Sequence, residues 1–282
     1  MRSLSLGYSP CPNDTFLFYP LVHGLVDTGE FRFSERLDDV ETLNRLALDG
    51  ALDVCKVSFH AFAFIREHYV LLRSGGAMGR GCGPLVLSRN RMEPEELRHM
   101  RIAVPGRLTT AQLLLNLFVP APREIVSLPF HEIMDAIAQG RVDAGVVIHE
   151  SRFTYPAYGL HQVMDLGVWW ESRTGLPLPL GGIAARRTLG SSALSAVNGI
   201  VRSSVAYARS HPDESLSYVR AHSQEMNEEV CASHIGLYVN DFSLDPGSEG
   251  EKAAQTLFAM GERLGLLPRL TTNTYLSNIS RA

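Results

Sequence analysis

The N-terminal segment Gly7–Phe16 has the composition of a ligand-binding turn. It reads Gly-Tyr-Ser-Pro-Cys-Pro-Asn-Asp-Thr-Phe, follows a short apolar run and precedes a helical pattern. Pro12 restricts φ, and Asn13 or Asp14 is expected to cap the first turn of the helix. Turns from strand to helix present polar side chains and backbone donors at the carboxyl edge of a sheet, where open α/β proteins hold small ligands. Ser9, Asn13 and Asp14 are therefore candidate ligand-binding residues.

Three further segments place polar side chains directly after predicted strands: Lys56–Ser58, Thr109–Thr110 and His149–Glu150. The two threonines follow a glycine turn at the start of a predicted helix, where hydroxyl and N–H groups favour an anion. The alternative is that one threonine only caps this helix. The ammonium group of Lys56 is expected in the same cleft, although a surface lysine that packs its stem is an almost equal alternative.

His149 is the candidate for acid–base chemistry. It ends the small and apolar run 144–148, which reads as a buried strand. Partial desolvation there can tune an imidazole near neutral pH, as a general base requires. A hydrogen-bonded core histidine is the commoner outcome for such a position. Glu150 is expected on the opposite face of the strand and is not assigned to orient His149. The other nine histidines are interpreted as structural or solvated.

The elements that position these residues alternate between strand and helix. Apolar runs and turn signals predict strands near residues 4–8, 31–37, 51–57, 70–72, 83–88, 101–105, 125–128, 142–149 and 176–185, most of them followed by helices. Residues 162–170 are also expected to be extended. Beyond residue 190 the pattern is mainly helical, over 192–211, 212–223, 227–239 and 250–265.

Two passages of the chain are built alike, which predicts two α/β lobes. Residues 50–58 and 140–149 each follow an amphipathic helix with glycine, one residue, an apolar residue, aspartate and a buried strand. Extended crossovers are expected near 83–90 and 178–186. This is the plan of a two-lobed solute-binding fold, with lobe 1 formed by residues 1–88 and 184–282 and lobe 2 by residues 89–183. A single doubly wound domain with a helical tail is the alternative.

Bulk composition excludes several classes of protein. The 282 residues are 45% hydrophobic and 20% charged, which is ordinary for a globular protein. The formal net charge of −4 argues against a nucleic-acid partner, which would favour a basic surface. The N-terminus lacks the apolar stretch of a signal peptide, and no run approaches the ~20 apolar residues of a membrane span. A cytoplasmic protein that does not enter the membrane is therefore expected.

Cysteine usage fits a reducing compartment. Cys11, Cys55, Cys82 and Cys231 form no CxxC pair, so free thiols are expected and a zinc site is not. Cys11 is a possible nucleophile, but a small residue packed in a tight turn is the favoured interpretation.

Taken together and in order, the motifs resemble one known family. Ser9–Phe16, Lys56–Ser58, Thr109–Ala111 and His149–Glu150 are similar to the 1,4-dihydroxy-6-naphthoate synthase family of the futalosine route to menaquinone. The resemblance extends from the first strand to the C-terminal helices. It implies a type 2 periplasmic-binding-protein-like α/β fold used as a cytoplasmic carbon–carbon lyase. The implied reaction converts cyclic dehypoxanthinylfutalosine to 1,4-dihydroxy-6-naphthoate, without a metal or another cofactor.

The resemblance also implies roles for individual residues. His149 would be the proton acceptor, and Lys56, Val57, Ser58, Thr109 and Thr110 would bind a small carboxylate substrate. Two other functions remain open. One is chorismate dehydratase, a similar enzyme of the same pathway, which the N-terminal octapeptide and His149 disfavour. The other is a non-catalytic solute receptor, for which a signal peptide or a lipoprotein cysteine would be expected.

Overall fold

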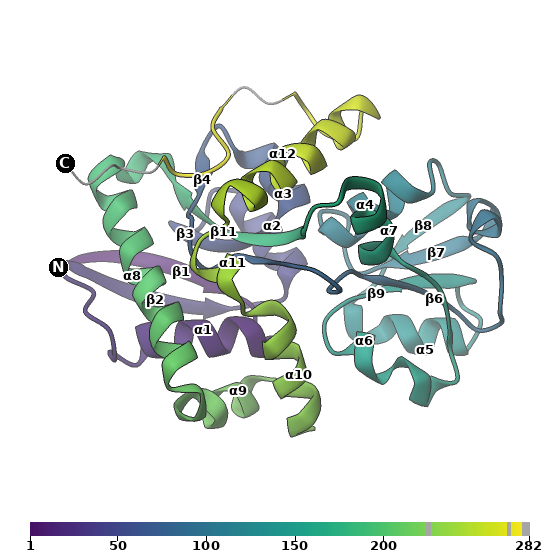
Figure 1. The fold of residues 1–282 in the computed structure, drawn as a ribbon, viewed down its shortest axis with the longest axis horizontal. Coiled ribbons are helices and arrows are strands. Elements are labelled where there is room, and N and C mark those ends of the chain that lie inside the picture. Colours follow the sequence, from purple (N-terminus) through teal and green to yellow (C-terminus); the bar gives the residue numbers. More distant parts are fainter. Residues whose placement is uncertain (224–226, 270–271, 278–282) are drawn as a thin grey trace.

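Two β-sheets lie side by side along the long axis of the molecule, each with helices on its faces (Figure 1). The computed structural model describes residues 1–223, 227–269 and 272–277. The first sheet contains β1 (Arg2–Tyr8), β2 (Phe31–Leu37), β3 (Val54–Ser58), β4 (Tyr69–Leu71), β5 (Ala77–Gly79) and β11 (Leu178–Arg186). Its strand order is β2-β1-β3-β11-β4, and β5 pairs with β11. The pairs that β1 forms with β2 and β3 are parallel, whereas β11 is antiparallel to β3, β4 and β5.

The second sheet repeats this plan on a smaller scale. It contains β6 (Leu85–Ser88), β7 (Arg101–Val104), β8 (Glu124–Ser127), β9 (Ala144–Val147) and β10 (His161–Asp165). The strand order is β10-β6-β9-β7-β8, with β7 parallel to β8 and β9 and with β6 antiparallel to β9 and β10. In both sheets the parallel strands send their carboxyl ends toward polar turns, as the alternation of strands and helices predicts.

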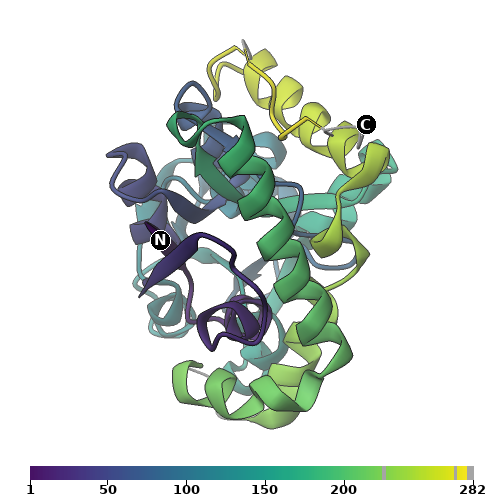
Figure 2. The same ribbon diagram turned by 90° about the vertical axis from the view of Figure 1, so that its left-hand side faces the viewer.

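Helices connect and cover the sheets. The α-helices are α1 (Pro12–Val22), α2 (Val40–Leu48), α3 (Phe59–Ile65), α4 (Thr110–Phe118), α5 (Ile133–Ala138), α6 (Ser151–Thr154), α7 (Leu166–Thr174), α8 (Ser191–Ser210), α9 (Leu216–His222), α10 (Glu228–Tyr238), α11 (Asp241–Leu244) and α12 (Gly247–Arg263). Short 3₁₀ turns occur at Pro94–His99, Phe130–Glu132, Tyr155–Tyr158, Arg187–Leu189 and Pro212–Ser215. Figure 2 shows the long helix α8 crossing one side of the molecule, where it packs against α1.

Apolar side chains from the sheets and helices form the core. On one face of the first sheet, Leu6 of β1 lies in a buried cluster with Phe18 of α1 and Val201 of α8. In the second sheet, Val147 of β9 packs in a cluster with Ile137 of α5. Burying such aliphatic and aromatic side chains contributes about 1.5–3 kcal/mol each, which holds the strand ends and their polar turns in place.

The repeated passages occupy equivalent places in the two sheets, as the sequence predicts. Gly50 ends the helical segment before β3, and Gly140 ends the one before β9, both with positive φ (63° and 71°). β3 lies between β1 and β11, and β9 lies between β6 and β7, so each strand is central in its sheet. The residues that follow these two strands therefore come from the middle of each sheet.

Sheet membership differs from the expected lobe boundaries at two strands. Residues 85–88 form β6 of the second sheet, although the sequence groups them with lobe 1. Residues 178–183 belong to β11 of the first sheet, although the sequence groups them with lobe 2. The chain passes between the sheets near 80–84 and 175–177 instead. Backbone pairing with distant strands decides this membership, and an apolar run does not reveal its partner.

The extended segment expected over 162–170 is wrong in its second half. The strand stops at Asp165, whose carboxylate accepts hydrogen bonds from the N–H groups of Gly167 (2.8 Å) and Val168 (3.1 Å). This cap starts α7. Trp170 is expected in the extended segment but lies in α7. Its indole N–H donates a hydrogen bond to the carbonyl of Pro177.

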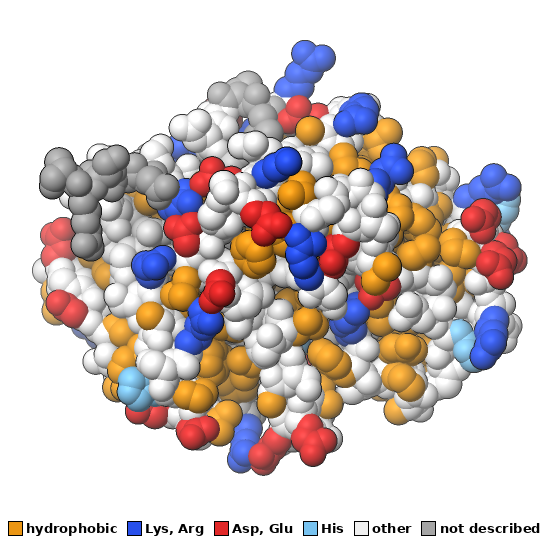
Figure 3. All heavy atoms as spheres, in the orientation of Figure 1, with side chains coloured by type: hydrophobic (Ala, Val, Ile, Leu, Met, Phe, Trp, Pro, Cys, Tyr) orange, Lys and Arg blue, Asp and Glu red, His pale blue; other side chains and the backbone are white. Residues whose placement is uncertain are grey.

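The surface carries charges of both signs. On the face seen in Figure 3, Lys and Arg side chains are interspersed with Asp and Glu over both halves of the molecule. Among the described residues, none of the helices combines the length and the apolar character needed to cross a membrane.

Candidate active site

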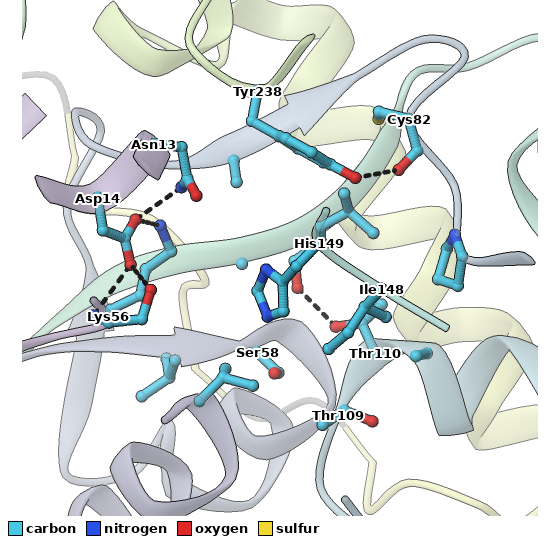
Figure 4. A pocket seen from close by; sticks show the side chains of 18 of the residues that line it. Asn13, Asp14, Lys56, Ser58, Cys82, Thr109, Thr110, Ile148, His149 and Tyr238 are labelled. Atoms are coloured by element: carbon cyan, nitrogen blue, oxygen red, sulfur yellow. Dashed lines mark hydrogen bonds and ion pairs between the residues drawn. The ribbon is translucent and has the colours of Figure 1, made fainter. Parts of the chain in front are cut away.

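A pocket between the two sheets collects the polar segments singled out in the sequence. Side chains from both sheets and from the C-terminal helices surround it (Figure 4). Every candidate residue predicted from the sequence lines this pocket: Ser9, Asn13, Asp14, Lys56, Val57, Ser58, Thr109, Thr110 and His149. Residues not predicted also line it, namely Val40, Ala77, Cys82, Pro84, Ala111, Ile148, Leu180, Gly181, His234 and Tyr238.

Asp14 organises the side of the pocket formed by the first sheet. One of its carboxylate oxygens forms an ion pair with Nζ of Lys56 and accepts a hydrogen bond from Nδ2 of Asn13 (2.8 Å). The other oxygen accepts hydrogen bonds from Oγ (2.7 Å) and N–H (3.2 Å) of Ser9. Figure 4 shows Asp14 and Lys56 turned toward each other. The pair leaves two N–H donors of the lysine for other acceptors.

The expected capping role of Asn13 or Asp14 is wrong. Helix α1 begins at Pro12, and the residue before it, Cys11, occupies the capping position without a side-chain hydrogen bond. The Cys11 carbonyl accepts from the N–H groups of Asp14 (3.1 Å) and Thr15 (3.0 Å). Asn13 and Asp14 therefore lie inside the first turn, and their side chains point to the pocket network instead of back to the backbone.

Ser58, at the end of β3, is held by a residue that the sequence analysis missed. Its N–H donates to Oδ1 of Asn44 (2.9 Å), and Nδ2 of Asn44 donates to Oγ of Ser58 (3.2 Å). Nδ2 of Asn44 also approaches the carbonyl of Leu108 in the second half of the molecule (3.3 Å). The available sequence signal was an asparagine beside the apolar residues Leu43 and Ala47 of the predicted helix, and the structure shows it fully buried.

The turn before α4 is bonded to the first half of the molecule. The buried carboxylate of Glu41 in α2 accepts hydrogen bonds from the N–H groups of Arg107 (3.0 Å) and Leu108 (3.1 Å). Gly106 has φ +155°, and a Cβ there would lie 2.4 Å from Oε2 of Glu41. Only glycine therefore allows this close approach between the carboxylate and the backbone.

The two threonines have different local roles. Thr109 is the N-cap of α4, where its Oγ1 accepts from the N–H of Gln112 (3.3 Å) and donates to the carbonyl of Gly106 (2.8 Å). Oγ1 of Thr110 donates to the carbonyl of Leu180 in β11 (2.6 Å). Both hydroxyls keep a lone pair, and the first turn of α4 has N–H groups without helical partners. The pocket wall can therefore bind an anion or a hydroxyl.

His149 follows β9, the strand next to β7 that leads to the two threonines, and it lies in a turn and not in the expected strand. β9 ends at Val147, and His149 adopts a left-handed backbone conformation with φ 56°. Non-glycine residues in this region are uncommon and cluster at functional sites. The turn ends the strand and directs the imidazole into the pocket (Figure 4). Glu150, expected on the far face of a strand, is the buried residue that precedes α6.

The imidazole of His149 lines the pocket with a pKa below the near-neutral value expected from the sequence, because it is more completely buried than the sequence indicates. Its ring packs against Phe130 (centroids 5.1 Å apart) and His234 (6.0 Å) and has no hydrogen bond with the described residues. Burial lowers the pKa of His149 to about 4, partly opposed by the charge of Asp14. At neutral pH the ring is therefore uncharged, and a nitrogen lone pair is available to a bound molecule.

His234 and Tyr238 of α10 complete the pocket and were not predicted. The ring of His234 is fully buried between His149 and Tyr238 (centroid distances 6.0 and 4.6 Å), and Oη of Tyr238 donates to the carbonyl of Cys82 (3.3 Å). From the sequence this histidine is expected to be structural or solvated, and the structure places it in the pocket instead. Its spacing of four residues from Tyr238 puts both on one helix face, which was the available signal.

The cysteines are free thiols, as predicted, and all four are buried. Burial raises the pKa of Cys11 well above its ordinary value and that of Cys55 and Cys82 to about 12, so these side chains stay protonated at neutral pH. Cys11 packs in its turn and does not line the pocket. Over the described ranges, His, Cys, Asp and Glu side chains form no group of three or more that could hold a metal ion.

Comparison with protein families and curated proteins gives a consistent result over nearly the whole chain. A family profile described as menaquinone biosynthesis matches residues 4–263. A 1,4-dihydroxy-6-naphthoate synthase from Thermus thermophilus is 56% identical over 270 residues, covering 94% of this chain and 96% of the relative. A protein of the same name from Streptomyces coelicolor is 48% identical over 273 residues, covering 95% and 96%.

Solved structures agree on the fold. A protein from Archaeoglobus fulgidus is 37% identical with a TM-score of 0.89, covering 94% of this chain and 98% of its own. A Candida albicans protein described as having the generic periplasmic-binding-protein fold gives a TM-score of 0.72 at 15% identity, covering 100% and 99%. The alkanesulfonate-binding protein SsuA from Xanthomonas axonopodis gives 0.70 at 16%, covering 95% of both chains. The last two show the fold alone, and they confirm the predicted periplasmic-binding-protein-like architecture.

Proposed function

Because the chain belongs to the menaquinone biosynthesis family, we propose that it converts cyclic dehypoxanthinylfutalosine to 1,4-dihydroxy-6-naphthoate with His149 as the general base. The two curated relatives are named for the formation of this product. Membership of the family makes the chain an enzyme, which sets aside the solute-receptor alternative. The observation that carries the proposed mechanism is the imidazole of His149, which lines the same pocket as Thr109 and Thr110 and has no hydrogen-bond partner among the described residues.

The geometry supports a division of labour between the two walls of the pocket. The substrate carries an aromatic carboxylate, which suits the first turn of α4 at Thr109 and Thr110. Lys56 has already formed an ion pair with Asp14, so its remaining N–H groups serve as hydrogen-bond donors more than as an unpaired charge. Ser58, which is fixed by Asn44, offers a hydroxyl to the sugar-derived part of the substrate.

His149 would start the reaction by removing a proton next to a carbonyl. The electron pair of that C–H bond moves into the carbocycle, the bond between the carbocycle and the sugar-derived part breaks, and the sugar-derived part leaves with the electron pair of the broken bond. The proton stays on His149, and formation of an aromatic ring in the product supplies driving force. A positioned base typically contributes ~10²–10⁴-fold to the rate. Orientation of the substrate between the two walls and electrostatic stabilisation in the closed pocket supply the remainder.

The test is an assay of purified protein with cyclic dehypoxanthinylfutalosine, with product followed by chromatography. His149→Gln is compared with wild type and with His211→Gln, which changes an exposed histidine at the end of α8. We expect turnover by wild type and His211→Gln and a loss of at least ~10²-fold in kcat for a folded His149→Gln. Chorismate is run in parallel, since turnover of chorismate alone would reject the proposed reaction in favour of the dehydratase. Full activity of His149→Gln would reject His149 as the base.

A further inference from the structure

His234 has an unusual hydrogen-bonding state for a fully buried histidine. Its Nε2 lies 2.9 Å from Oδ1 of Asn13, whereas its Nδ1 is buried without a hydrogen-bond partner among the described residues. The ring also stacks on that of His149, with centroids 6.0 Å apart and an interplanar angle of 18°. An orphaned buried nitrogen is rare and calls for an explanation.

Asn13 determines which nitrogen of His234 carries the proton. Nδ2 of Asn13 donates to the carboxylate of Asp14 (2.8 Å), so Oδ1 of the same amide faces His234 as an acceptor. Nε2 of His234 must then be the protonated donor, and Nδ1 holds only a lone pair. A second proton would place an N–H without a partner in a buried site, beside His149 and near Lys56. The ring is therefore held neutral.

The contact joins opposite sides of the pocket. His234 comes from α10, which packs on α1, and His149 follows β9 of the second sheet. Tyr238, one turn further along α10, packs against the ring of His234 with centroids 4.6 Å apart and an interplanar angle of 46°. His234 is thus fixed by Asn13 and Tyr238, whereas the side chain of His149 makes ring contacts but no hydrogen bond with the described residues.

From this arrangement we infer that His234 is a positioning residue for His149, a role that rests on the function proposed above. The ring of His234 orients the imidazole of His149 across the cleft. Asn13 holds His234 in the neutral Nε2–H form, so His234 does not compete with His149 for the proton of the substrate. A neutral His234 also does not repel the imidazolium that His149 becomes. Stacked aromatic rings at this separation contribute about 0.5–1.5 kcal/mol beyond the area that they bury. Small errors in the placement of a base cost up to ~10²-fold in rate.

The kinetic test compares His234→Ala, His234→Phe and His211→Ala. The charged and titratable groups around His149 include Asp14, Lys56, Asp39, the adjacent buried Glu150 and His234, and only His234 is changed. We expect His234→Ala to lower kcat by ~10-fold or more, with KM within about twofold of wild type. We also expect the acid limb of the pH–rate profile to move to higher pH, because water that reaches His149 raises the pKa of its imidazole. His234→Phe should recover most of kcat by restoring a ring, and His211→Ala should match wild type.

Histidine NMR gives a second readout that does not need turnover. Labelled wild-type protein should show His234 as the neutral Nε2–H tautomer from pH 5 to 8, and the His149 resonance should titrate at higher pH in His234→Ala than in wild type. A protonated or Nδ1–H form of His234 would overturn the inference, whatever the reaction proves to be. So would a folded His234→Ala with wild-type kcat, or a change confined to KM. If His234→Ala does not fold, the tautomer of His234 in wild-type protein and the kcat of His234→Phe provide the test.

Discussion

Lys56 and Asp14 form a buried ion pair beneath the pocket, with only 7% and 1% of their side chains exposed. The two residues come from β3 and from the first turn of α1. Ser9 and Asn13 donate further hydrogen bonds to the same carboxylate, so all of its oxygens have partners. A buried charge pair is tolerated when its remaining hydrogen bonds are satisfied, and this one connects every predicted polar residue of the pocket wall formed by the first sheet except Ser58.

Replacing Asp14 by Asn is predicted to destabilise the fold. The change leaves the ammonium group of Lys56 buried without a counter-charge, and breaking a buried pair in this way costs about 3–5 kcal/mol. The free energy of unfolding from urea titration at pH 7 measures the loss. The matched control is Asp38→Asn, which removes the exposed pair with Arg36 (2.6 Å) and should change stability by less than about 1 kcal/mol. Equal effects of the two substitutions would contradict the prediction.

Acidification is predicted to destabilise the enzyme through His149. Burial lowers its pKa to about 4 in the folded protein, whereas the unfolded chain has the ordinary value of about 6.5. Between these values the unfolded chain binds a proton that the folded protein does not, so the free energy of unfolding falls as the pH decreases from about 6.5 to about 4. Its contribution is on the order of 1–3 kcal/mol.

Urea titrations between pH 7 and pH 4 would check this prediction, with His149→Gln as the comparison. Its stability should fall less steeply with decreasing pH than that of wild type. Some slope should remain, because burial also lowers the pKa of His234 well below its ordinary value. Identical slopes in the two proteins would show that His149 is not shielded from water.

Replacing Thr109 and Thr110 together by Ala is predicted to raise KM several-fold, with a smaller effect on kcat. Both hydroxyls line the pocket, and the Thr109 hydroxyl also caps α4, so a loss of about 1 kcal/mol in stability should accompany the change. The double replacement by Ser, which keeps the hydroxyls, is the matched control and should restore KM. Michaelis–Menten kinetics at saturating and limiting substrate separate the two constants. An unchanged KM for the alanine variant would leave the pair with a structural role only.

Glu41→Ala is predicted to weaken substrate binding from outside the pocket. The carboxylate accepts two backbone N–H groups of the turn that carries Thr109, so its loss releases the anion-binding wall. Losing two part-buried hydrogen bonds to a charged acceptor costs about 1–3 kcal/mol, which should appear as lower stability and a higher KM. Glu41→Gln keeps one acceptor oxygen and should be intermediate. A KM equal to that of wild type in the alanine variant would show that the hydrogen bonds from Arg107 and Leu108 to Glu41 do not support substrate binding.

Local sequence was sufficient for much of the site because of how β-α units are built. Whatever the partner strands are, the residues after a parallel strand lie at the carboxyl edge of its sheet. The prediction that Lys56–Ser58 and Thr109–Thr110 line one pocket therefore did not require the strand order of either sheet. The repeated glycine–aspartate passages likewise indicated two similar sheets, and the cysteines were identified as thiols from their spacing alone.

Tertiary structure decided what depends on distant partners. Strand pairing put residues 85–88 and 178–183 in the sheets opposite to those expected, because hydrogen bonds along a strand edge carry no local sequence signal. The sequence alone suggests that Asp14 caps α1, but in the folded protein its carboxylate pairs with Lys56 instead. The charged ammonium group attracts the carboxylate more strongly than a backbone N–H does. His234 meets His149 only because α10 packs on α1, far along the chain. The sequence by itself determined which residues end the strands, and the packing of the two halves determined which of them touch.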